Sequence, residues 1–357
     1  MAQAPTHSLL SLPDDEIIQK IREMSLEEVL ILSFVSERCK NLVKSTKIKG
    51  TSFHVTIGSS ISVHIERSPK RMELKFFTEP DIKWEWGDYG RKKIKLATPQ
   101  SVMTGVFETT VSRKRKLRFI WKKNELTMEE WLKHLQDVFS YHKIDCIWFF
   151  NNSYRFYIDD IKKVFGNATQ LKVQNTGCHC FNQMIIEQIF HIEKLQINTS
   201  NIQTSKIPKK VLMRNFVSLQ IDNELPETNS MTLDELLLIN SKEIYIEGRQ
   251  VPANQLNRFI KLWQRGSNPR MEWFAISLKN AREGDNEVIM RGVEHCAMPT
   301  NTIRKFKVGG NKVPHMIGCG MDIYRNDGVK ATIRFTKSHS FSFLDMYVWF
   351  DHCVVES

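Results

Sequence analysis

A short apolar pattern recurs along the chain from residue 144 onward and constrains its fold more than any other feature. Each copy has apolar residues at its fourth and sixth positions and, in most copies, at its first. The seven copies are IDCIWF, ATQLKV, IEKLQI, FVSLQI, SKEIYI, MEWFAI and IRKFKV, and their fourth positions are residues 147, 171, 195, 219, 244, 274 and 306. The spacings are therefore 24, 24, 24, 25, 30 and 32 residues. A period in the twenties is typical of stacked strand-helix units.

The segments between the copies have helical periodicity. LNRFIKLW places apolar residues at i, i+3, i+4 and i+7, and TMEEWLKHLQDVF, IDDIKKVF and CFNQMIIEQIF carry similar stripes. Alternating strands and helices predict an α/β fold with parallel strands and right-handed crossovers. The asparagine of ordinary leucine-rich repeats occurs only as Asn152, so we interpret the array as leucine-rich-repeat-like. KLRFIW, from residue 116, is a candidate for an earlier strand of the array.

Within each predicted strand, the residues between the apolar positions point away from the core because strand side chains alternate. These residues form a row that combines aromatic, amide and charged groups. The candidate substrate-binding residues of this row are Trp148, Lys172, Gln196, Gln220 and Tyr245, with Ala275 at its end. Such a mixture suits protein recognition. The alternative is that helices or the flanking β segments cover this face.

The N-terminal stretch from residue 9 to 45 predicts three short helices. Ile17, Ile18, Ile21 and Met24 form one apolar stripe, and Ser25 with Glu28 predicts a capping box at the start of a second helix. Three helices of this size bury too little surface to fold robustly alone. We therefore expect this block to be completed by another protein or by the rest of the chain.

This stretch resembles the F-box in its Leu-Pro pair, the following apolar helix, the LEEV step and the VSERCKNLV ending. Arg22 departs from the family pattern, which usually has leucine there. The resemblance implies binding of a Skp1-like adaptor and, through it, a cullin. By position, it implies apolar adaptor contacts from Leu12, Pro13, Ile17, Ile18, Leu26, Val29, Leu30 and Val35. The alternative is an N-terminal helical cap on the neighbouring domain.

The later stretches IPKKVLMRNF, LDELLLINSKEIYI and LNRFIKLWQRGSNPRMEWFAI resemble the type-two F-box-associated domain of nematode F-box proteins, and DIYRNDGVKATI resembles its ending. That resemblance implies capture of a protein substrate whose identity the sequence does not name. We predict an F-box at 8–48, a β-rich connecting segment at 52–112, a repeated strand-helix domain at 113–310 and a C-terminal β segment at 318–355.

The flanks of the array alternate apolar and polar residues, as antiparallel strands do. SFHVTIG, SISVHIE and RMELKFF lie before the array, and ATIRFTK and SFSFLDMYVWF lie near the C-terminus. NDG, at residues 326–328, is a hairpin turn signal. Two arrangements stay open at this point: the flanks pair with one another, or they cap the two ends of the array.

No motif predicts bond chemistry in this chain. The sequence has no G-x-S-x-G, H-E-x-x-H or Walker pattern, so we expect no catalytic residues and no cofactor. Seven scattered cysteines without a C-x-x-C pair predict neither a disulfide framework nor a metal site, and adjacent residues in CHC at 178–180 cannot all reach one ion. The basic run RKRKLR at 113–118 is interpreted as a solvated face.

The favoured hypothesis is a non-catalytic, substrate-recognition subunit of a Skp1-cullin-F-box ubiquitin ligase. The sequence has no signal peptide and no apolar stretch of membrane-spanning length, so we expect a soluble protein of the cytoplasm or nucleus that binds no membrane. Nucleic acid is not expected as a partner. The alternative hypothesis is a repeat scaffold outside any ligase that binds protein or nucleic acid through a basic surface, because the net charge is +11.

Overall fold

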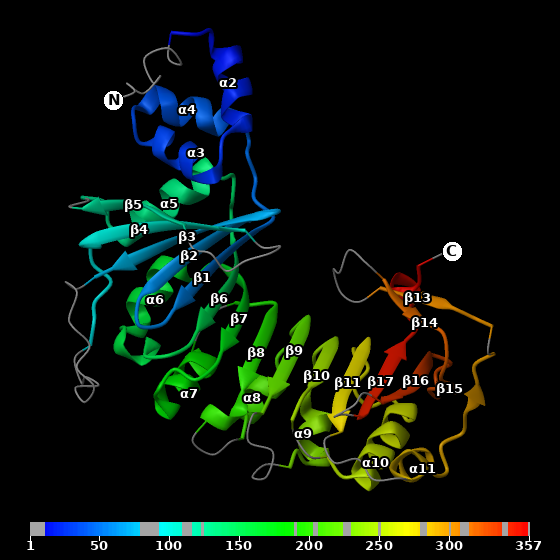
Figure 1. Ribbon diagram of the computed structural model, residues 1–357. Coiled ribbons are helices and arrows are strands. Elements are labelled where there is room, and N and C mark those ends of the chain that lie inside the picture. The colour runs from blue at the N-terminus through cyan, green and yellow to red at the C-terminus, as the bar shows by residue number, and fades with distance from the viewer. Residues whose placement is uncertain are drawn as a thin grey trace. The chain divides into compact units, whose positions relative to one another are not determined.

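The computed structural model describes residues 11–78, 93–108, 116–122, 125–188, 191–202, 206–223, 230–248, 251–278, 284–299, 301–307, 314–337 and 342–355 (Figure 1). The chain divides into two compact units. Unit 1 comprises Met1–Thr169 with Ile189–His191, and unit 2 comprises Gln170–Gln188 with Ile192–Ser357. The mixed α/β class expected from the sequence is confirmed, whereas the domain boundaries proposed above stay predictions.

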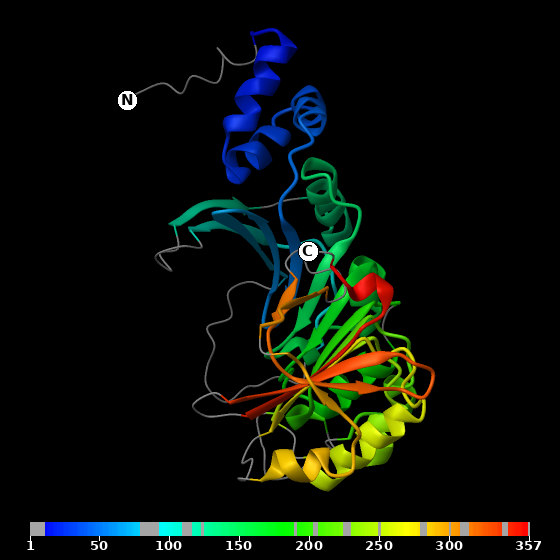
Figure 2. The ribbon, with the colours of Figure 1, turned by 90° about the vertical axis from the view of Figure 1, so that its right-hand side faces the viewer.

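Three short helices form the N-terminal part of unit 1, which we call the helical block (residues 11–45). They are α2 (Asp14–Glu23), α3 (Leu26–Ser33) and α4 (Glu37–Ser45). The predicted capping box is present, since the Glu28 amide donates to Ser25 Oγ while the Ser25 amide donates to the Glu28 carboxylate. Ser36 caps α4 without such a box, because its side chain accepts a hydrogen bond from the Cys39 amide. Figure 2 shows the three helices gathered as one group.

The sheet of unit 1 is mostly antiparallel, with strand order β6-β1-β2-β3-β4-β5. Its strands are β1 (Ser52–Ile57), β2 (Ile61–Arg67), β3 (Lys70–Phe77), β4 (Ser101–Glu108), β5 (Lys116–Lys122) and β6 (Ile144–Phe149). The antiparallel strands predicted between residues 52 and 78 are thus confirmed. β1 pairs with β6 in parallel. The segment KLRFIW, in contrast, is an antiparallel neighbour of β4 and not a member of the parallel series, so that prediction was wrong.

Two further α-helices occur among the described residues of unit 1: α5 (Met128–Val138), which begins at a capping box of Thr127 and Glu130, and α6 (Ile158–Phe165). The stripe predicted on α5 is buried, with Trp131 and Leu135 fully inaccessible. Trp131 packs with Phe76 of β3, whose ring centroid lies 5.6 Å from its own. The amphipathic face of α5 therefore forms part of the hydrophobic core of unit 1.

Unit 2 contains a run of parallel strands at the predicted copies. These strands are β7 (Ala168–Val173), β8 (Lys194–Asn198), β9 (Ser218–Asp222), β10 (Glu243–Ile246) and β11 (Trp273–Leu278). Each is parallel to the next, and the fourth positions of the copies, from Leu171 to Phe274, occupy one register row. They are buried because helices pack on this face.

Helices connect these strands along the chain, and in Figure 1 they lie on one side of the strands. They are α7 (His179–Gln188), α8 (Lys209–Leu212), α9 (Leu233–Leu238), α10 (Ala253–Gln264) and, after β11, α11 (Asp285–Met290). On α10 the stripe of Leu256, Phe259, Ile260 and Trp263 is buried. Phe259 lies 5.0 Å from Phe274 of β11, centroid to centroid, which identifies the helical face of the sheet. Among the described residues, no helix is long and apolar enough to cross a bilayer.

The C-terminal strands of unit 2 continue its sheet beyond β11 in the order β17-β16-β15-β12. These antiparallel strands are β12 (Cys296–Ala297), β15 (Met321–Tyr324), β16 (Lys330–Lys337) and β17 (Ser342–Val348). The sequence left open where the flanking strands pair. Within unit 2 the C-terminal flank joins the array, because β17 pairs with β11, and within unit 1 the N-terminal flank joins the strand of the first copy, because β1 pairs with β6. The NDG hairpin is confirmed between β15 and β16, where Gly328 has a φ of +88°.

The seventh copy of the repeat was misassigned. Its residues form β13 (Arg304–Phe306), which pairs antiparallel with β14 (His315–Ile317) in a separate two-stranded sheet. The position beside β11 is occupied by β17, so no parallel neighbour can follow there. Phe306 is nevertheless fully buried, in a cluster with Met298, Ile317, Tyr347 and Cys353. The apolar pattern correctly predicted a buried strand but not its partner.

Candidate functional site

The helical block buries some of the predicted adaptor-contact residues and leaves others accessible. Ile17, Leu26, Val29 and Leu30 are buried within unit 1. In contrast, Leu12 and Ile18 are half-buried, and Pro13 and Val35 are exposed. Val35, at 58% exposure, is the most exposed large apolar side chain of the block. The four buried residues, on α2 and α3, belong to the interior of unit 1, and the other four remain accessible to solvent.

Phe34 and Ser33 at the end of α3 attach the helical block to α5. The Phe34 ring stacks on the His134 ring at a centroid distance of 4.1 Å and also lies 5.1 Å from Trp131. Ser33 Oγ lies 2.8 Å from His134 Nε2, while it donates to the Leu30 carbonyl. Burial lowers the pKa of His134 to about 4, so the ring is neutral at pH 7 and Nε2 acts as a hydrogen-bond partner rather than a charge. The block is thus packed against the body of unit 1.

The predicted substrate-binding row is largely realised on the sheet of unit 2. Lys172, Gln196, Gln220 and Tyr245 are direct register partners across four parallel strands, on the face opposite the helices. All four are half-buried. Ala275 continues the row but is buried. Trp148 belongs to β6 in unit 1, where it is the register partner of Thr56 and contacts Phe150.

Side-chain hydrogen bonds run along this row, and the one from Gln196 of β8 to Asp222 of β9 joins neighbouring strands. Gln196 and Gln220 both donate to the Asp222 carboxylate, at 2.8 and 3.0 Å, and the Tyr245 hydroxyl donates to Glu247 at 3.2 Å. Burial and the Glu247 charge raise the pKa of Tyr245 to about 12. At the far end, the β13–β14 hairpin covers the sheet, since the His315 ring lies 5.8 Å from that of Trp273. The row is therefore a polar, internally bonded surface that becomes covered at β11.

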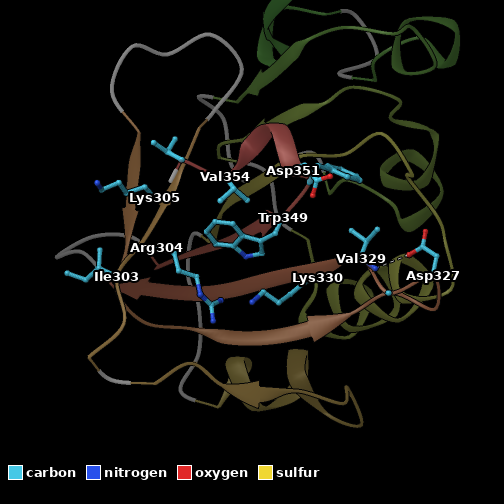
Figure 3. Close-up of a pocket in the computed structure, with 12 residues that line it drawn as sticks. Ile303, Arg304, Lys305, Asp327, Val329, Lys330, Trp349, Asp351 and Val354 are labelled. Atoms are coloured by element: carbon cyan, nitrogen blue, oxygen red, sulfur yellow. Dashed lines mark hydrogen bonds between the residues drawn. The ribbon is translucent and has the colours of Figure 1, made fainter. Parts of the chain in front are cut away.

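A cavity lies at the C-terminal end of unit 2, and the sequence analysis did not predict it. This C-terminal cavity has a volume of about 820 Å³. It is lined by Ile303, Arg304, Lys305, Asp327, Gly328, Val329, Lys330, Trp349, Phe350, Asp351, Val354 and Val355. In Figure 3 the Trp349 indole lies in the middle, with Arg304 and Lys330 together on one side and Asp327 and Asp351 on the other.

Asp322 organises the cationic side of this cavity from beneath. Its carboxylate accepts two hydrogen bonds from the Arg304 guanidinium, at 2.7 and 2.8 Å, and one from Thr332 Oγ1 at 2.6 Å. Lys330 Nζ lies 3.5 Å away. Burial opposes ionisation of Asp322, but the bonds from Arg304 and Thr332 outweigh it and lower its pKa. Trp349 Nε1 donates to the same Thr332 hydroxyl at 2.8 Å, which fixes the indole above this network.

Glu272, His352 and Cys353 form the one grouping of metal-ligand type found among the described residues, and we interpret it as an ion-pair cluster. Their ligand atoms lie within 4.8 Å of one another. However, the Glu272 oxygen that faces His352 at 2.9 Å also binds Lys242 Nζ at 2.6 Å. Burial raises the pKa of the Cys353 thiol to about 11, so it is protonated at pH 7. The CHC residues lie elsewhere, where α7 begins. Part of the basic run RKRKLR, residues 113–115, lies outside the described residues.

Only one sequence signal pointed toward the C-terminal cavity. Asp327 to Lys330 belong to the stretch that resembles the end of the F-box-associated domain, and its turn was predicted. The other lining residues come from β13 and from residues 349–355, which follow β17. Val355 donates to the Lys305 carbonyl, and Lys307 donates to the Cys353 carbonyl, so these two segments pair. No periodicity within either segment reveals that pairing.

The comparisons with known proteins agree with part of the sequence analysis. Residues 207–276, from before α8 to within β11, match the family model described as F-box associated. The chain is also similar to "F-box associated domain-containing protein sdz-33" of Caenorhabditis elegans, with 24% identity over 285 residues that cover 77% of this chain and 80% of that protein. No solved structure matches the chain. The resemblance of the helical block to an F-box stays a prediction. The chain therefore contains an F-box associated domain and is a distant relative of sdz-33.

Proposed function

We propose that this chain is the substrate-recognition subunit of a Skp1-cullin-F-box ubiquitin ligase. In this role the helical block is an F-box that binds a Skp1-like adaptor, and unit 2, a leucine-rich-repeat-like array with its C-terminal strands, binds the target. The match to the F-box associated family supports the second assignment, because such domains are named for their association with an F-box. Our proposal includes no bond chemistry by this chain.

The observation that carries the proposal is the unequal burial of the helical block. One set of its apolar side chains, including Ile17 and Leu30, is fully buried by the chain itself. A second set stays accessible, with Val35 58% exposed and Pro13 exposed. A small three-helix group that is firmly packed on one side and apolar on another is suited to a second protein. If the block were only an N-terminal cap, its accessible side would be expected to be polar.

The chain would then act by proximity. An adaptor that holds a ubiquitin-charged enzyme and a domain that holds a target raise the local concentration of one for the other. Such a mechanism needs a stable junction between the adaptor-binding element and the body of the protein. The stacking of Phe34 on His134 and its contact with Trp131 supply such a junction within unit 1.

The test is adaptor binding by the full chain, measured by calorimetry with a purified Skp1-like protein from a nematode. We expect Leu12→Ala combined with Pro13→Ala, and separately Val35→Asp, to weaken binding about tenfold or more, because each removes apolar contact area without disturbing the buried set. Met213→Asp is the matched control, since Met213 is 57% exposed but belongs to unit 2. Unchanged affinity in both block variants would refute the assignment of this face.

A further inference from the structure

The walls of the C-terminal cavity combine an aromatic floor with exposed aliphatic side chains. Trp349 and Phe350 are half-buried, whereas Ile303 and Val354 are 66% and 47% exposed. Large apolar side chains that remain this accessible around a hollow mark a binding surface. Met316, the register partner of Lys305 on the neighbouring strand, is 54% exposed and extends the apolar surface beyond the cavity. A ligand that used all of it would be longer than a small metabolite.

The cationic side of the cavity has more positive charge than it can neutralise itself. Arg304 and Lys330 share the single carboxylate of Asp322, and Arg304 takes both of its oxygens. The side chain of Lys305, the next residue of β13, points away from Trp349 and Lys330 in Figure 3, because side chains alternate along a strand. Two cations therefore face one anion. The Lys330 ammonium group, unlike the guanidinium, retains donors that a ligand can use.

The other side of the cavity carries one exposed carboxylate. Asp327 forms a bidentate pair with Arg325, whose Nε and Nη2 donate to its carboxylate at 2.6 to 2.9 Å. The hydrogen bonds from Arg325 lower the pKa of Asp327, and the two charges balance each other. Asp351 adds the exposed carboxylate. The positive excess of the cavity is therefore confined to the side of the Trp349 indole where Arg304 and Lys330 lie.

We propose that the C-terminal cavity binds an acidic peptide of the target protein, with an apolar side chain against Trp349 and a neighbouring carboxylate against Lys330. This inference rests on the proposed function, since it names the class of substrate that unit 2 recruits. A carboxylate fits better than a phosphate, because the arginine that could grip a phosphate in a bidentate manner is already held by Asp322. The apolar contact supplies affinity, and Lys330 supplies selectivity for charge.

The experiment is fluorescence anisotropy with the full-length protein and three labelled octapeptides. Each peptide has one central leucine, flanked by glutamates, by glutamines or by lysines. We expect the glutamate peptide to bind at least about tenfold more tightly than the glutamine peptide, and the lysine peptide not to bind. Raising the salt from about 0.05 to 0.3 M should reduce the preference for glutamate, because the Lys330 contact is partly exposed. Equal affinity for all three peptides would overturn the proposal.

Single substitutions then locate the binding site. Lys330→Gln and Val354→Asp should each weaken binding of the glutamate peptide about tenfold, and neither replaces a fully buried side chain. Lys209→Gln and Met213→Asp are matched controls, because both residues are exposed on or directly after α8. Thermal melting of each variant separates misfolding from loss of contact. Wild-type affinity in both cavity variants would exclude this site.

Adaptor binding, measured on the same preparations, distinguishes this inference from the proposed function. We expect Lys330→Gln and Val354→Asp to bind the Skp1-like protein normally, and Val35→Asp to bind the glutamate peptide normally. Selective peptide binding without any adaptor binding would refute the ligase role and leave the peptide site standing. Adaptor binding without peptide selectivity would refute the peptide site and leave the ligase role standing.

Discussion

The helical block and the C-terminal cavity both leave apolar side chains in contact with solvent, but they are built differently. The accessible residues of the block, such as Pro13 and Val35, belong to one continuous segment held by its own helices. The cavity joins side chains from β13, from the β15–β16 turn and from the segment after β17. A surface made by one segment has a sequence signature, whereas a surface made by distant segments exists only once the chain has folded. The two should also respond differently to substitution.

The junction beneath the helical block should be the most sensitive position. Trp131 is fully buried and contacts Phe34, Phe76 and Trp121 at centroid distances of 5.1 to 5.9 Å. We expect Trp131→Ala to lower the free energy of unfolding by about 3–5 kcal/mol, because it leaves a large cavity among rings that cannot collapse into it. Urea denaturation followed by circular dichroism measures this effect. Trp148→Ala, at a 37% exposed position of the same unit, should cost far less, and equal losses would contradict the packing described here.

The second largest effect is expected at Asp322, which holds the cationic side of the C-terminal cavity in place. Asp322→Asn removes the charge that holds Arg304 and Lys330, and we expect a loss of about 3 kcal/mol because two cations are left with weaker partners. The lowered pKa of Asp322 also predicts a pH dependence. Its contribution is fully present above the ordinary aspartate pKa and disappears as the pH falls through the lower folded-state value. Stability below pH 4 should therefore fall less steeply in the variant. Asp351→Asn, at an exposed position, should change stability by less than about 0.5 kcal/mol.

The junction of the helical block should also sense pH, in a higher range than the cavity does. Burial lowers the pKa of His134 from 6.5 to about 4. Between these values the unfolded chain binds a proton that the folded chain refuses, so stability is full above pH 6.5 and falls as the pH approaches 4. We expect His134→Gln to reduce the loss between pH 7 and 4.5 by about 2 kcal/mol. His64, with a pKa lowered to about 3 by burial and by Arg71, should keep part of the slope in the variant. An unchanged slope would mean that His134 is protonated in the folded state.

Sequence reasoning reached as far as local periodicity allowed. The helices of the block, the capping residue Ser25 and the five parallel strands from β7 to β11 were predicted because each depends on residues near one another in the chain. Strand partners were harder. Phe306 was correctly expected in a buried strand, but its antiparallel pairing with His315 depends on which strand first occupies the edge of β11.

The two candidate sites of unit 2 also differ in how far the sequence predicted them. Four of the five predicted row residues are register partners in unit 2 because the 24-residue period sets both the strands and their alignment. The cavity was not predicted, since the Trp349 indole is placed by a hydrogen bond to Thr332, which lies on a neighbouring strand. Side chains that long-range pairing brings together leave no pattern in either segment. The net charge of +11 was visible, but not its local excess beside Asp322.

The smallest effect tests whether the helical block is as locally determined as its sequence signature suggests. Ser25→Ala removes one half of the capping box on α3, and Thr232→Ala does the same on α9 of unit 2. Each should cost about 1 kcal/mol, because a cap satisfies amide groups of its own helix whatever surrounds it. Paired urea denaturations of the two variants measure the difference. A loss at Ser25 much larger than that at Thr232 would mean that α3 also supports the junction through its first turn, and the block would then depend on its surroundings as the cavity does.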